Sequence, residues 1–168
     1  MKTPPPKSFP WREWTAAILW LILIAIESTP WLSAQNTGHV LYQLLVSFFG
    51  PVSASGVSAA NAVLRKVGHV IGYGILSWLL FRAWRATLGS YRGAAWALPW
   101  SVIAFFMTAA VASLDEWHQT FLPSRTGRLH DVILDSASAL AVQILLFLIL
   151  RKRGAAVADE QTVSVGSD

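Results

Sequence analysis

The chain has 168 residues, of which 54% are hydrophobic and only 13% charged, and its mean hydropathy is +0.49. This composition excludes an ordinary soluble domain and indicates a polytopic membrane protein. The absence of cysteine excludes disulfides, thiolate nucleophiles and thiolate metal sites. The net charge of +4 says less, because in a membrane protein the distribution of Lys and Arg matters more than their sum.

Four apolar runs are each near the roughly 20 residues that cross the hydrocarbon core as a helix. In chain order they are residues 14–31, 67–84, 94–114 and 132–150. Residues 39–50, in the first outer loop, repeat apolar side chains at helical spacing but are too few to span. The predicted fold class is therefore an all-α membrane protein, a four-transmembrane-helix bundle with a short interfacial helix in that loop.

Outside the spans, we expect a cytoplasmic lead over residues 1–13, a membrane domain over residues 14–151 and a disordered cytoplasmic tail over residues 152–168. The first span has a second interpretation as a cleaved signal peptide. Glu27 and Pro30 near its end argue against cleavage, and the other three spans keep their orientation in either case.

The positive charges are distributed unequally between the two sides of the predicted membrane. Nine of the thirteen Lys and Arg residues flank one side, while the other side has Arg65, Lys66, Arg125 and Arg128. The positive-inside rule therefore predicts that both termini are cytoplasmic and that residues 34–66 and 115–130 lie outside.

The outer stretch DEWHQTFLPSRTGRLHD, residues 115–131, gathers many polar groups between two apolar runs. Helical spacing aligns Lys66, His69 and Tyr73 on the second span, and Asp131 with Asp135 on the fourth. Charges below the headgroups are costly, so they tend to face the bundle interior and to mark function. The sequence therefore predicts one outward-opening polar cavity, with Glu27 of the first span at a similar depth.

These residues also resemble the pattern of the VanZ-like family of small membrane proteins. The resemblance rests on KVGHVIGYGILSWLLFRAW and DEWHQTFLPSRTGRLHDVILDSASAL, and it extends in architecture over about residues 15–150. Ser124 departs from the family's usual glycine, and Asp135 stands where asparagine is common. The resemblance implies a bacterial cytoplasmic-membrane protein of the cell envelope and an association with resistance to the glycopeptide teicoplanin.

Three interpretations of the polar cluster stay open. It is a pocket for a lipid or cell-wall precursor headgroup, or a catalytic site, or a structural latch between helices. The candidate catalytic residues are His69, Asp115 and Glu116, with His69 or Glu116 as general base. The candidate residues for binding the headgroup are Lys66, Tyr73, Gln119, Arg125, Arg128, Asp131 and Asp135.

We expect no cofactor. A divalent ion could in principle be held by His69, His118, Asp115, Glu116 and Asp131. We expect no metal, however, because the chain has no HExxH motif and no cysteine, and Lys66 and Arg125 would repel a cation nearby. Ser124 lacks the Gly-x-Ser-x-Gly turn that exposes a nucleophile. The basic residues form short flanks rather than a stripe, which excludes a nucleic-acid surface. The expected partners are thus membrane lipids or a lipid-linked cell-wall precursor, and the sequence names no partner protein.

Overall fold

The computed structural model describes residues 8–89, 95–123 and 127–165, with the side chains of 32, 34, 35 and 152–165 excepted. The described chain is helical throughout and contains no strand, which confirms the predicted all-α class for these residues. In chain order the elements are α1 (Trp11–Glu27), the 3₁₀ helix η1 (Pro30–Leu32), α2 (Ala34–Phe49), α3 (Ala54–Leu88), α4 (Leu98–Gln119) and α5 (Leu129–Val165).

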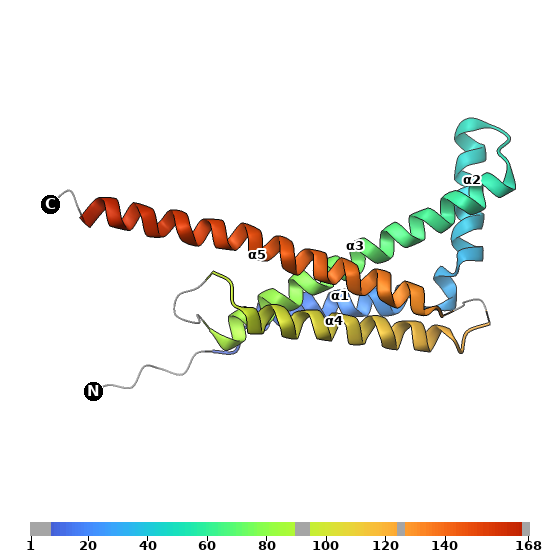
Figure 1. Cartoon of the computed structure of the whole chain (residues 1–168). Coiled ribbons are helices and arrows are strands. Elements are labelled where there is room, and N and C mark those ends of the chain that lie inside the picture. Colours follow the sequence, from blue (N-terminus) through green and yellow to red (C-terminus); the bar gives the residue numbers. More distant parts are fainter. Residues whose placement is uncertain (1–7, 90–94, 124–126, 166–168) are drawn as a thin grey trace.

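Helix α3 is the centre of the bundle. It packs against α1, α2, α4 and α5, and α4 also packs against α5. Figure 1 shows α2 standing across one end of the bundle, beside the end of α1, the end of α4 and the start of α5. The start of α1, the end of α3 and the start of α4 lie toward the opposite end.

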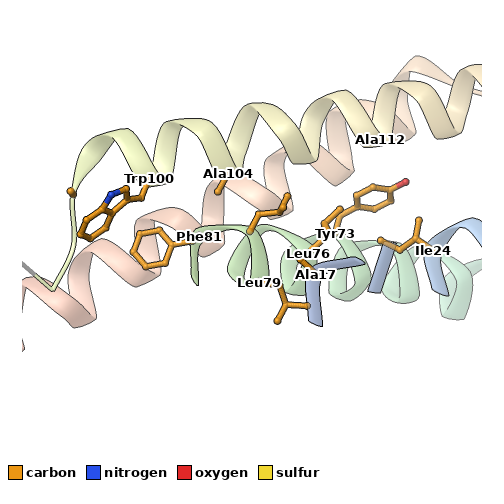
Figure 2. Packing of buried hydrophobic residues seen from close by; sticks show 11 residues of the cluster. Ala17, Ile24, Tyr73, Leu76, Leu79, Phe81, Trp100, Ala104 and Ala112 are labelled. Atoms are coloured by element: carbon orange, nitrogen blue, oxygen red, sulfur yellow. The ribbon is translucent and has the colours of Figure 1, made fainter. Parts of the chain in front are cut away.

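The apolar core follows α3 along the bundle (Figure 2). Phe81 meets the ring of Trp100 edge to face, with 6.1 Å between the ring centroids. Small residues are buried where helices approach closely, among them Ala17, Ala104 and Ala139. Small side chains at such contacts let helix backbones come together in a membrane, where apolar side chains gain nothing by leaving lipid.

Polar groups inside the bundle find partners across helices. Gln143 of α5 donates from Nε2 to the carbonyl and the hydroxyl oxygen of Ser77 on α3, at 3.0 and 2.8 Å. The Trp20 indole of α1 donates to the carbonyl of Gly72 at 2.9 Å. Cross-helix bonds of this kind satisfy polar groups that lipid cannot solvate.

The described residues contain two helical segments that are long and apolar enough to cross a membrane, Leu98–Gln119 and Leu129–Arg151. A third candidate span is the pair Asn36–Phe49 and Ala54–Leu88, which is bent by 120°. By length and composition, the described fold therefore contains two or three candidate membrane spans. Helix α1 has 17 residues and is not among these candidates.

Several helix bounds differ from those expected. Helix α3 begins at Ala54 rather than near Val67, because the Ser53 hydroxyl accepts from the N–H of Gly56 at 3.1 Å and caps a new helix start. Helix α4 continues to Gln119, beyond the predicted end of the third span at residue 114, so the whole DEWHQ stretch is part of a helix. Helix α5 runs to Val165, through residues expected to form a tail.

Helix α2 starts at Ala34, earlier than the predicted residue 39, because the Ser33 side chain accepts from the N–H of Asn36 at 3.4 Å. It ends at Gly50, whose φ of 79° lies in the left-handed region that glycine adopts without strain. The turn there reverses the chain into α3 and leaves α2 across the end of the bundle.

Candidate functional site

The polar stretch of the sequence forms the last turns of α4 and the first turns of α5, on the same end of the bundle as the end of α1 (Figure 1). Helical spacing directs Asp115 and Gln119 to one side of α4 and Glu116 to another. As a result, the polar residues divide into two groups that differ in how fully their hydrogen bonds are satisfied.

The first group is the Asp115 network, which consists of Ser28, Tyr73, Asp115 and Gln119. Asp115 Oδ2 accepts from the Tyr73 hydroxyl at 2.8 Å and from Gln119 Nε2 at 3.2 Å. Asp115 Oδ1 accepts from the Ser28 hydroxyl, just after α1. Ser28, Tyr73 and Gln119 are all buried, so both carboxylate oxygens are held by donors screened from solvent. This network joins α1, α3 and α4.

The second group is the histidine–carboxylate cluster of His69, Glu116 and Asp135, from α3, α4 and α5 respectively. One possible ligand atom from each of the three side chains lies within 4.8 Å of the other two. His69 Nδ1 is 3.2 Å from Asp135 Oδ2. The relative exposure of Glu116 is 5% and that of Asp135 is 0%, so two carboxylates are buried beside one imidazole.

This cluster is less completely satisfied than the Asp115 network. Within the described part of the chain, the buried Oδ1 atom of Asp135 has no hydrogen-bond partner. Burying a carboxylate oxygen without a donor costs free energy, and such groups in membrane proteins tend to have a functional explanation.

The turn between α4 and α5 orients Glu116. The backbone N–H of Arg128 donates to Glu116 Oε2 at 2.8 Å. Gly127 packs so close to the end of α4 that an added Cβ would lie 2.1 Å from the Glu116 carbonyl oxygen. Because Gly127 has no side chain, the turn can approach α4 closely, and the N–H of Arg128 comes within hydrogen-bond distance of Glu116.

A cavity of about 510 Å³ opens between the end of α1, helix α2 and the first half of α3. Its apolar wall includes Trp31, Val40, Leu41, Leu44 and Leu64, and its polar lining is Glu27, Asn36, Thr37, Asn61, Arg65 and His69. A second, much smaller cavity reaches Tyr73 and Asp115 and shares Glu27, Gly68 and His69 with the first. His69 thus belongs both to the cavity wall and to the histidine–carboxylate cluster.

The structure brings together six of the site residues expected from the sequence: His69, Tyr73, Asp115, Glu116, Gln119 and Asp135. Lys66 is exposed on α3 and does not line the cavity. Arg128 contributes its backbone rather than its exposed side chain, Asp131 is half-buried one turn before Asp135, and Arg125 lies outside the described residues.

Ser28 and the cavity wall were not expected from the sequence. Ser28 follows Glu27, at the outer end of the first apolar run, and that position is the one signal that pointed to it. Residues 39–50 were expected to form an interfacial helix, and Arg65 was placed only among the basic residues of the outer side. Their meeting depends on the 120° bend between α2 and α3.

Comparison with known proteins gives one positive result. A family model described as VanZ/LLP1 matches residues 14–151. No curated protein and no solved structure matches the chain.

Proposed function

The chain belongs to the VanZ/LLP1 family, and we propose that it is an integral membrane protein whose outward-facing pocket binds the headgroup of a lipid or of a lipid-linked cell-wall precursor. In this proposal α1, α3, α4 and α5 each span the bacterial cytoplasmic membrane once, with both termini in the cytoplasm. The excess of Lys and Arg on the flanks assigned to the cytoplasm supports this topology.

The cavity beside His69 is the observation that carries the proposal. Its volume of about 510 Å³ lies within the usual range for ligand pockets. One wall is apolar and suits the first carbons of a lipid chain, while Arg65, Asn61 and His69 offer donors for an anionic or hydroxylated headgroup. An amphipathic cavity of this kind fits an amphipathic ligand better than it fits a free sugar or a free ion.

The two polar groups then have different roles. The Asp115 network, whose carboxylate oxygens already accept from three donors, serves as the interhelical latch. This favours a structural role for Asp115 over the catalytic one expected from the sequence. His69, which lines the cavity, remains as the group that would contact the headgroup. His69 or Glu116 would act as a general base in a modification of the headgroup.

Teicoplanin acts on cell-wall precursors outside the membrane, so a pocket that holds such a precursor would connect this protein to glycopeptide resistance. Lipid-anchored precursors carry a pyrophosphate and sugars, which match the donors of the cavity. We therefore place this ligand ahead of an ordinary phospholipid headgroup.

The experiment compares Arg65→Gln with Arg85→Gln, which removes the same charge from the other end of α3. The purified full-length protein is titrated in detergent with a short-chain pyrophosphate-linked precursor analogue, with phosphatidylglycerol and with phosphatidylcholine. We expect binding of the precursor analogue and a loss of about tenfold or more in Arg65→Gln, because one charge-assisted contact contributes about 1.5–3 kcal/mol. Arg85→Gln should bind as the unmodified protein does.

Equal affinity of the two variants for the precursor analogue would contradict the proposal. Equal binding of all three lipids by the unmodified protein would also contradict it, since the cavity would then be selecting an acyl chain rather than a headgroup.

A further inference from the structure

We propose that His69, Glu116 and Asp135 bind one divalent metal ion between α3, α4 and α5. The metal site goes beyond headgroup binding, and its test uses no lipid ligand. It also reverses the sequence-based expectation that no metal binds here.

The donor set is suited to a divalent ion. An imidazole nitrogen and two carboxylate oxygens are ligands for Zn²⁺ and Mn²⁺, and no thiolate is required. With metal–ligand bonds of about 2.0–2.2 Å, two donors on one tetrahedral ion lie about 3.3–3.6 Å apart. His69 Nδ1 and Asp135 Oδ2, at 3.2 Å, are already close to this spacing. The widest separation among the three ligand atoms is no more than 4.8 Å, so metal binding would require this distance to shorten.

The unpartnered oxygen of Asp135 is the second, independent observation. Asp135 is fully buried, and its Oδ1 atom lacks a hydrogen-bond partner among the residues that the structure describes. A metal ion that the Asp135 carboxylate holds through both oxygens would satisfy Oδ1 as well as Oδ2. It would also balance the charge of two buried carboxylates, which a single imidazole does not.

The hydrogen bonds that orient the cluster also fit a metal site. Metal-binding carboxylates are usually oriented by hydrogen bonds from a second layer of groups. Here the N–H of Arg128 holds Glu116 Oε2 at 2.8 Å, and the turn at Gly127 makes that bond possible. Three protein ligands would leave at least one coordination position for water or for an oxygen of a ligand.

The main argument against a metal loses part of its basis in the structure. It relied on repulsion by Lys66 and Arg125. The Lys66 side chain is exposed rather than directed into the cluster, and Arg125 lies outside the described residues. In the described part of the chain, no Lys or Arg side chain forms an ion pair with Glu116 or Asp135.

The test titrates chelator-treated, full-length protein in detergent with ZnCl₂ and with MnCl₂ by calorimetry, and it records thermal unfolding with and without each metal. We expect one ion per chain and a higher melting temperature in the presence of the preferred metal. Asp135→Asn and Glu116→Gln should each weaken binding by about 100-fold, because each replaces an anionic carboxylate ligand with a neutral amide. The control Glu13→Gln removes a carboxylate that contacts Arg82 at 2.7 Å, outside the cluster, and should leave the affinity unchanged.

Folded protein that binds neither metal stoichiometrically would overturn the proposal. Binding that survives in both Asp135→Asn and Glu116→Gln would do the same, since it would point to exposed histidines such as His118 or His130. If one variant fails to fold, the other decides. Failure of headgroup binding is a separate outcome, because it is measured with Arg65→Gln and a lipid probe.

Discussion

Asp115 shows how one half-buried carboxylate can hold several helices together. It receives hydrogen bonds from Ser28 after α1, from Tyr73 of α3 and from Gln119 of its own helix. Because lipid offers no donors, these partners replace the hydration that the carboxylate would have in water. Asp135 lies in the same end of the bundle but has one oxygen without such a partner among the described residues. The same residue type therefore serves two purposes within one site.

The substitution Asp115→Asn tests the structural role of Asp115. The amide keeps the shape but replaces one acceptor oxygen with a donor, which then faces a hydroxyl or amide that was itself donating. We expect the free energy of unfolding to fall by about 1–3 kcal/mol, measured by thermal or denaturant unfolding in detergent. Tyr73→Phe removes only one of the three donors and should cost less, about 0.5–1.5 kcal/mol. An Asp115→Asn protein as stable as the original would show that the network is not a latch.

At the scale of elements, the connection between α4 and α5 determines how the site is assembled. Gly127 packs against the end of α4, where an added Cβ would also come within 2.7 Å of Thr120 Cγ2. This contact sets the first turn of α5 against α4, with the N–H of Arg128 on the Glu116 carboxylate. The glycine of the TGR stretch thus serves the fold and the site through the same close approach.

Gly127→Ala should therefore displace the turn. The nearest atom to the new Cβ is a backbone oxygen, which cannot rotate away, so we expect a loss of about 1–3 kcal/mol in unfolding free energy. The matched control is Gly68→Ala, where an added Cβ meets nothing within 4 Å and alanine favours helix by about 1 kcal/mol. Unfolding in detergent compares the two variants. A Gly127→Ala protein that unfolds no more easily than Gly68→Ala would contradict the close packing.

At the scale of the whole molecule, the proposed topology sends the four long helices alternately through the membrane. The end of α4 and the start of α5 then lie outside, together with α2 and the cavity, and the end of α3 lies inside (Figure 1). Many large apolar side chains are exposed on the helices, among them Leu140, Ile144, Leu145 and Leu148 of α5. This surface is what a helix presents to lipid.

Accessibility of single cysteines tests this orientation, since the chain has no cysteine of its own. Thr120→Cys lies exposed after α4, and Ala86→Cys lies exposed near the end of α3. An impermeant thiol reagent applied to intact cells should label Thr120→Cys. It should label Ala86→Cys only after lysis, because the positive-inside rule puts Arg82 and Arg85, near the end of α3, in the cytoplasm. The reverse pattern would invert the topology and place the cavity on the cytoplasmic side.

The sequence by itself determined the helical class, the membrane character and the family. Backbone N–H and C=O groups in lipid must form hydrogen bonds with each other, and within a single apolar run only a helix achieves this. This constraint acts locally along the chain. It also determined which polar residues reach one end of the bundle, since helical spacing follows from residue numbers alone. The match over residues 14–151 confirms the family resemblance, while the four-span count and the orientation stay predictions.

Only the tertiary structure decided which of those polar groups are satisfied and which are not. That outcome depends on how each helix is rotated about its axis and on partners from distant segments, such as Ser28 for Asp115 and the N–H of Arg128 for Glu116. It also depends on the bend between α2 and α3, which builds a cavity wall from residues that looked interfacial. Packing between helices sets these rotations and bends. The sequence pattern along one helix therefore cannot distinguish Asp115, whose carboxylate oxygens both accept hydrogen bonds, from Asp135, which has one oxygen without a partner among the described residues.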